Sequence, residues 1–144
     1  FIHKETLSLS RHEANSILDN EFEFLLKKDN SLAREFYMDL KIKQFKPKVI
    51  VDYVREAYTL NYNNIRITFD KFLKTGLENK DLFNENIPVI SAIDESFFIL
   101  EIKYSNFLPD HIKSVVQIES SLRQAISKYV YCRKFTKLRS WEDQ

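Results

Sequence analysis

The residues best suited to chemistry are two arginines in neighbouring stretches that alternate between apolar and polar side chains. Residues 65–70 place apolar side chains on one face and Arg66 on the other. In residues 48–57, Tyr53 and Arg55 share a face. A planar guanidinium donates two parallel hydrogen bonds to an oxyanion. These stretches therefore predict a β-hairpin that carries two arginines, a residue type suited to binding an oxyanion.

The connection between the two stretches leaves their register open. Residues 60–64 are turn-prone, which predicts a hairpin loop. If this loop keeps the register, Arg55 and Arg66 face the same way. A bulge, or one more residue in the loop, would put them on opposite faces.

A third alternating stretch, residues 97–104, repeats the pattern with Glu101 and Lys103 on one face. In an ordinary sheet the apolar face packs on the core and the charged face meets water. The alternative is a small barrel, covered outside by helices, whose interior is lined by Arg55, Arg66, Glu101 and Lys103. Such a barrel would hold an anion.

Composition restricts the class of protein. The chain has 144 residues, one domain's length, and a net charge of only +1, so we expect no nucleic-acid partner and an anion site that is local. No apolar run is long enough to span a membrane, and the N-terminus lacks the layout of a signal peptide. Cys132 is the only cysteine; we interpret it as a structural thiol rather than a nucleophile, in a reducing compartment.

Standard enzyme motifs are missing from the sequence. With a single glycine the chain cannot build a glycine-rich phosphate loop, and it contains no Walker, nucleophile-elbow or zinc-protease motif. Its three histidines show no metal-ligand spacing. Any phosphate must therefore be bound by side chains.

The elements around these strands predict an α+β domain over residues 1–144. We expect a strand over residues 1–7, a helix from Ser10 to about residue 26, a second capped by Ser31, a loop over residues 77–95 and a third helix with Pro109 in its first turn. A last helix is expected to begin near residue 120 or 121. Its inward residues would be Leu122, Ala125, Ile126, Tyr129 and Val130, with Lys128 beside that stripe.

An ordered set of short motifs resembles the VTC domain. The motifs are Tyr53-Val-Arg55, Ile65-Arg-Ile-Thr-Phe-Asp70, Leu100-Glu-Ile-Lys103, Phe107-Leu-Pro109 and Ser127-Lys-Tyr129. This is the polyphosphate polymerase domain of vacuolar transporter chaperones and bacterial relatives, in the triphosphate tunnel metalloenzyme superfamily. The resemblance implies an antiparallel β-barrel tunnel with a polar, basic interior, flanked by helices. This chain would cover its larger C-terminal part and lack the N-terminal strands, without which the barrel cannot close.

The resemblance also implies roles for individual residues. Arg55, Arg66 and Lys128 would be catalytic, and Glu101 would bind Mn²⁺ or Mg²⁺. The substrate-binding residues would be Lys4, Tyr53, Arg55, Arg66, Lys103, Ser127 and Lys128. Ala125, one turn before Lys128, departs from the family, where polymerases can carry a basic residue.

The implied enzyme is an ATP-dependent polyphosphate polymerase with ATP and polyphosphate as its partners. Two alternatives stay open: a non-catalytic module that binds polyphosphate or another polyanion, and a triphosphate hydrolase of the same superfamily. We expect a cytoplasmic location, either free or attached to a membrane through parts outside this chain. Unpaired strand edges predict that the fragment aggregates or self-associates.

Overall fold

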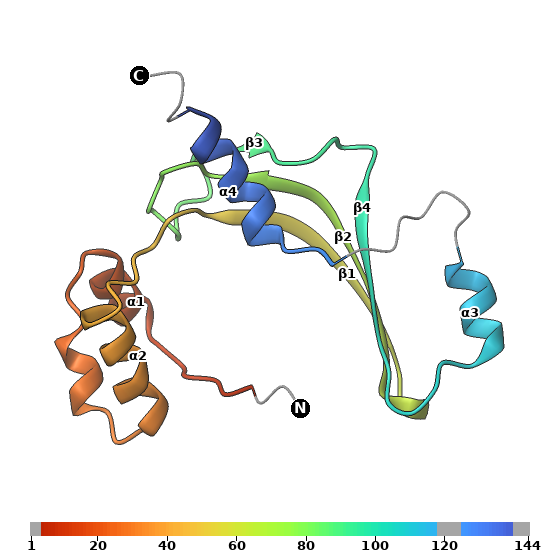
Figure 1. Ribbon diagram of the computed structural model, residues 1–144, viewed down its shortest axis with the longest axis horizontal. Coiled ribbons are helices and arrows are strands. Elements are labelled where there is room, and N and C mark those ends of the chain that lie inside the picture. The colour runs from red at the N-terminus through yellow and green to blue at the C-terminus, as the bar shows by residue number, and fades with distance from the viewer. Residues whose placement is uncertain (1–3, 118–124, 140–144) are drawn as a thin grey trace. The chain divides into compact units, whose positions relative to one another are not determined.

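A computed structural model describes residues 4–117 and 125–139 of the chain. It divides into two compact units, Phe1–Lys48 and Val49–Gln144, and each is described by itself. The elements in chain order are α1 (Arg11–Leu18), η1 (Glu23–Lys27), α2 (Ser31–Lys41), β1 (Val51–Leu60), η2 (Tyr62–Asn64), β2 (Ile65–Thr75), β3 (Ile90–Ser91), β4 (Phe98–Lys103), α3 (Asp110–Val116) and α4 (Lys128–Arg139) (Figure 1). The single domain over residues 1–144 stays a prediction.

The first unit consists of α1, η1 and α2 around a small apolar core. The predicted capping box is confirmed: Ser10 accepts a hydrogen bond from the Glu13 amide, and Glu13 accepts one from the Ser10 amide. The helix ends at Leu18 and not near residue 26, because Asn20 has a left-handed φ of 71°. Its core residues are Ile17, Phe22, Leu25, Ala33 and Leu40.

Two expectations for this unit were wrong in detail. The N-cap of α2 is Asn30, whose side chain accepts from the Ala33 amide, and not Ser31. The strand predicted over residues 1–7 is not formed by residues 4–7, and residues 1–3 lie outside the described part.

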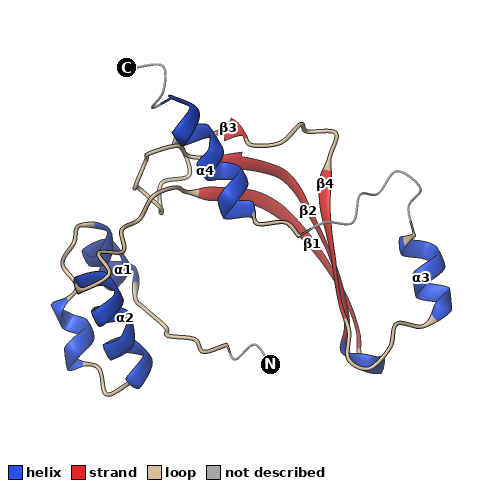
Figure 2. Cartoon of the chain, viewed as in Figure 1, coloured by secondary structure: helices blue, strands red, loops and turns tan. Residues whose placement is uncertain are grey.

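The second unit is built on an antiparallel sheet with β2 at its centre (Figure 2). β1 pairs with one edge of β2, and β3 and β4 pair with successive parts of the other edge. Helices with an antiparallel sheet confirm the α+β class. Within the described residues the sheet is open, with β1 and β4 at its edges, and it does not close into a barrel.

The strand register answers the question left open by the loop. Arg55 lies opposite Asp70 and Thr59 lies opposite Arg66, so the two arginines share one face. A register shift does occur, between Asp52 and Val54, but it lies before Arg55 and leaves the arginines in phase.

The two faces of this sheet differ in chemistry. The charged face carries Arg55, Arg66, Asp70, Glu101 and Lys103, and the apolar face carries Tyr58, Ile67, Phe69, Phe98 and Leu100. Helix α4 packs against β1 and β2 at the charged face, where its Cys132 Sγ donates to the Lys74 carbonyl (Figure 1). The apolar face is partly open: Tyr58 is 59% exposed and Phe98 43%, whereas Ile67, Phe69 and Leu100 are half-buried. Val115 and Val116 of α3 border a hollow of about 490 Å³ on that face.

The last helix differs most from its prediction. α4 begins at Lys128, and residues 125–127 before it are not helical, whereas residues 118–124, with Leu122 and the predicted start, lie outside the described part. The predicted inward stripe is wrong: Ala125, Ile126, Tyr129 and Val130 are exposed. Cys132 is fully buried instead.

Two further expectations can be compared with the structure. Pro109 precedes α3 directly as its N-cap, so the helix begins one residue later than predicted. Residues 77–95 form a loop interrupted by the short strand β3. Among residues 4–117 and 125–139, no helix combines the length and apolar character needed to cross a membrane.

Candidate anion-binding site

The candidate site is centred on the carboxylate of Asp70, which is fully buried in β2. Its Oδ1 accepts a hydrogen bond from Arg55 Nε at 2.5 Å, and its Oδ2 accepts one from Arg55 Nη2 at 2.7 Å. This two-pronged geometry follows from the register, because Arg55 and Asp70 are direct cross-strand partners. The pair fixes the guanidinium plane against the sheet.

Lys128 completes the cluster from another element. It is the first residue of α4, and its Nζ lies 2.6 Å from Asp70 Oδ2. Its side chain is only 19% exposed. Ser127, just before it, accepts a hydrogen bond from the Val130 amide at 3.4 Å, so its hydroxyl acts as a helix cap. The two residues of the predicted Ser127–Lys128 pair therefore have different contacts: Ser127 caps the helix, and Lys128 contacts Asp70 on the charged face.

Tyr53 supplies an aromatic platform for both cations. Arg55 Cζ and Lys128 Nζ each lie 5.2 Å from the centroid of its ring. Cations at this distance are attracted by the negative face of a ring. Tyr53 and Arg55 of one short motif and Lys128 of another are therefore brought together by the fold.

The hydrogen bonds of the cluster favour the charged forms of Asp70 and Arg55. The hydrogen bonds from Arg55, and then those from Lys128, hold the pKa of Asp70 below its ordinary value of 3.8, against the opposing effect of burial. The hydrogen bond to Asp70 raises the pKa of Arg55. At neutral pH the three groups carry two positive charges and one negative, which leaves a net charge of +1.

Donor groups remain for a ligand after Asp70 is satisfied. A guanidinium has five N–H donors and an ammonium three. Asp70 takes two from Arg55 and one from Lys128. Within the hydrogen bonds of the described residues, three N–H groups of Arg55 and two of Lys128 are left for an incoming anion.

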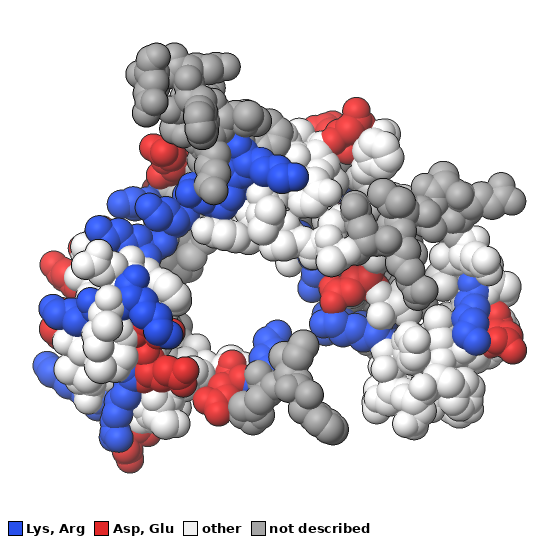
Figure 3. Space-filling model, viewed as in Figure 1, with Lys and Arg blue, Asp and Glu red and all other residues white. Residues whose placement is uncertain are grey.

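A second group of charges lies further along the same face. Arg66 and Lys103 are direct cross-strand neighbours on β2 and β4, and Lys103 Nζ lies 3.1 Å from Glu101 Oε1. Arg66 is exposed and stands four residues from Asp70 along β2, roughly 13 Å in an extended strand. Figure 3 shows basic side chains with acidic ones beside them on this unit. An anion that contacts both groups must be elongated.

The metal prediction rests on a single carboxylate. Among the described residues there is no group of three or more His, Cys, Asp or Glu side chains that could hold an ion. Glu101 is 40% exposed and Asp70 is already engaged by two cations. Mg²⁺ commonly takes one or two carboxylates and completes its shell with substrate phosphates and water, so Glu101 fits such a partial site.

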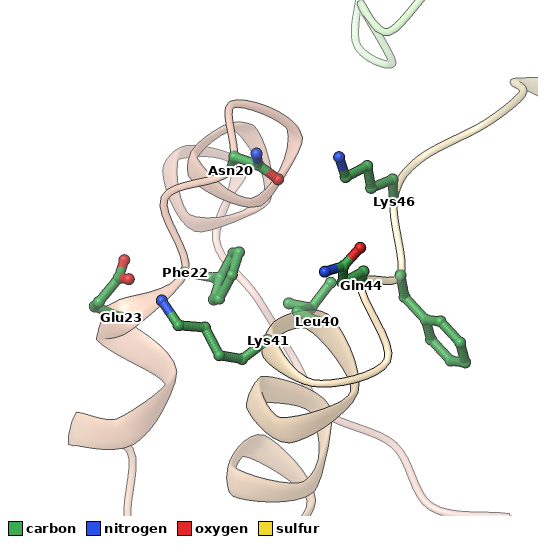
Figure 4. A pocket seen from close by; sticks show the side chains of 8 residues that line it. Asn20, Phe22, Glu23, Leu40, Lys41, Gln44 and Lys46 are labelled. Atoms are coloured by element: carbon green, nitrogen blue, oxygen red, sulfur yellow. The ribbon is translucent and has the colours of Figure 1, made fainter.

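Two features belong to the first unit. Lys4 is exposed there, and its role in phosphate binding stays a prediction. The first unit also has a hollow of about 390 Å³, and Figure 4 shows the side chains that line it. Its lining residues are Asn20, Phe22, Glu23, Leu40, Lys41, Gln44, Phe45 and Lys46. All its polar side chains are exposed, so this hollow is a weaker candidate for a binding site than the Asp70 cluster.

Sequence reasoning missed Asp70 as a site residue. Alternation placed it on the face of Arg66, and the register that matched Arg55 to Arg66 also placed it opposite Arg55. An acidic residue at the centre of a basic face was the available signal. In the sequence alone, Asp70 is only the last residue of a short motif.

Comparison with known proteins gives one match. No curated protein and no solved structure matches the chain significantly. A family model described as the VTC domain matches residues 1–137, nearly the whole length. The motifs and the match agree, and the chain therefore belongs to the VTC domain family, which implies a polyphosphate-related function.

Proposed function

We propose that the protein is a polyphosphate polymerase that transfers the terminal phosphoryl group of ATP onto a polyphosphate chain. The chain's family is associated with this activity. The charged face of the sheet is the binding surface in this proposal. Arg55, Arg66 and Lys128 are its catalytic cations.

The observation that carries the proposal is the burial of a charged residue, Asp70, on the charged face of the sheet. A solvated sheet buries its apolar face and exposes its charged one. Here Asp70 is fully buried and Thr68 is 3% exposed on the charged face, whereas Val54 and Tyr58 on the apolar face are 53% and 59% exposed. Burying charge costs free energy unless partners offset it. The buried Asp70 is consistent with a site that must hold charged groups in fixed positions.

Phosphoryl transfer needs alignment and charge neutralisation more than covalent help from the protein. In the proposed reaction Arg55 orients one phosphate through its remaining N–H groups. The ring of Tyr53 supports the Arg55 guanidinium through the cation–π contact. Lys128 adds a compact charge that can follow a phosphate as it moves. Arg66 and Lys103 bind the chain about 13 Å further along β2.

Glu101 is the proposed ligand for Mn²⁺ or Mg²⁺. A divalent cation bound there would neutralise the charge that develops on the phosphate oxygens. Glu101 Oε1 lies 3.1 Å from Lys103 Nζ in an exposed ion pair, which a bound divalent cation would have to displace or share.

The proposal includes a tunnel formed around this sheet. Strands β1 and β4 present open edges in the described residues, where further strands could pair. In such a tunnel Ser127 contributes to phosphate binding near one end. We propose a cytoplasmic location for this domain.

The decisive experiment is incubation of purified protein with ATP and Mn²⁺, followed by separation of the phosphate products. Accumulation of long-chain phosphate supports the polymerase. Binding of polyphosphate without consumption of ATP would replace it with a binding module, and release of orthophosphate would replace it with a hydrolase. Arg66→Gln should abolish chain growth, and Arg34→Gln is its matched control, because Arg34 is an exposed arginine of α2 paired with Asp29 at 3.4 Å.

A further inference from the structure

One carboxylate holds two like charges close together. Arg55 and Lys128 come from β1 and α4, yet both contact Asp70 and both lie 5.2 Å from the centre of one ring. Two cations this close repel each other. Among the described residues, Asp70 is the anion within hydrogen-bond distance of both, and it is fully buried, so water screens these interactions little.

The position of Lys128 in its helix strengthens this argument. It occupies the first turn of α4, where the helix dipole disfavours a positive charge. Helix stability therefore does not account for a lysine there. Its contact with Asp70 offsets this cost and ties the start of α4 to the centre of the sheet.

We propose that Asp70 is a positioning residue: a built-in counter-anion that holds Arg55 and Lys128 together before a polyanion arrives and limits how strongly they attract it. This inference rests on the proposed function, since the ligand is a polyphosphate. Asp70 does not compete for the remaining donors. A phosphate can enter against three N–H groups of Arg55 and two of Lys128 while the carboxylate keeps both cations in place.

Asp70→Asn separates charge from shape. The amide has nearly the same volume, but it is neutral and directs an NH₂ group toward cations that can only donate. The net charge of the cluster rises from +1 to +2 while its geometry loosens. We expect binding of tripolyphosphate at low salt to be as tight as in the parent or a few-fold tighter. We expect turnover of ATP to fall at least tenfold.

The coupling between Asp70 and Lys128 gives a readout that needs no ligand. Urea unfolding of Asp70→Asn, Lys128→Met and the double variant forms a thermodynamic cycle. We expect clear non-additivity. The matched control is the cycle of Asp110→Asn and Lys113→Met, an exposed pair at 2.9 Å on α3 that should be nearly additive.

The outcomes are distinguishable. An additive Asp70–Lys128 cycle overturns the inference whatever the ligand. Parent-like turnover in Asp70→Asn overturns it too, as does a loss of binding and turnover that matches the loss of folded protein. If parent and Asp70→Asn both fail to bind tripolyphosphate, the proposed function fails, and the counter-anion role fails with it. Tight binding by folded Asp70→Asn protein, together with lost turnover and a non-additive cycle, supports the inference.

Discussion

Replacing Lys128 by methionine tests the centre of the site, because it removes one charge and keeps most of the side-chain length. The lost hydrogen bond to Asp70 joins two charged groups, an interaction worth about 1.5–3 kcal/mol. Removing a cation from the first turn of α4 returns about 0.3–1 kcal/mol. Asp70 keeps both bonds from Arg55, so the larger cost of an unpaired buried charge does not apply. We expect the free energy of unfolding to fall by about 1–2 kcal/mol.

Two measurements check this prediction. Urea unfolding at neutral pH gives the change in stability, and calorimetric titration with tripolyphosphate at low salt gives the change in affinity. Since a phosphate would lose a charged hydrogen bond, we expect affinity to fall about tenfold or more. The matched control is Lys134→Met, a second lysine of α4 whose ammonium lies 5.1 Å from the Tyr131 ring. It should change stability by about 1 kcal/mol at most and leave affinity unchanged.

The result that would refute the reasoning is a Lys128→Met protein that binds tripolyphosphate as tightly as the parent at low salt. Lys128 would then be a structural partner of Asp70 and α4 only a cover over the sheet. Equal losses in Lys128→Met and Lys134→Met would instead point to the helix as a whole.

Three other predictions concern Glu101, Asp70 and Cys132. Glu101→Gln should abolish metal-dependent turnover and leave the melting temperature nearly unchanged. The control Glu56→Gln removes an ion pair with Lys71 on the opposite face and should leave turnover intact. Loss of stability without loss of activity in Glu101→Gln would contradict this prediction. Because the pKa of folded Asp70 lies below 3.8, its contribution to stability should be constant at higher pH and disappear as pH falls through the folded value, so urea unfolding of parent and Asp70→Asn should converge in strong acid. Burial raises the pKa of the Cys132 thiol, so a thiol reagent at neutral pH should label it only after denaturation, and rapid labelling of folded protein would be inconsistent with its position.

Short-range patterns predicted much of the second unit. Alternation identified β1, β2 and β4 and the faces on which Arg66 and Glu101 lie, because a strand's period of two is visible in the sequence itself. The residue that pairs with each strand residue across the sheet is not visible in this way. Whether Arg55 faced Arg66 depended on a loop that contains two left-handed asparagines, Asn63 and Asn64, whose effect on register no pattern specifies.

The helical prediction failed where tertiary contacts decide. Leu122, Ala125, Ile126 and Tyr129 form a consistent helical stripe, yet α4 begins at Lys128 and buries Cys132. The competing interaction is the ion pair of Lys128 with Asp70, 58 residues earlier in the sequence. Hydrophobic periodicity carries no information about such a contact. The importance of Asp70 depends on this same ion pair, which no local pattern in the sequence shows.

The distribution of charge on the sheet explains how a nearly neutral chain can attract a polyanion. The charged face and Lys128 together carry four basic side chains, Arg55, Arg66, Lys103 and Lys128, and two acidic ones, Asp70 and Glu101. Their net charge of +2 exceeds the +1 of the whole chain, so the remaining residues sum to a small negative charge. A field of this kind acts only nearby, because charges are screened beyond about 10 Å at 0.1 M salt. The roughly 13 Å between Asp70 and Arg66 is comparable with that distance, so each end of the face acts almost independently on its own phosphate. Tripolyphosphate affinity should therefore fall steeply as salt rises, and a single orthophosphate, which can reach only one end, should bind far more weakly than a chain that reaches both.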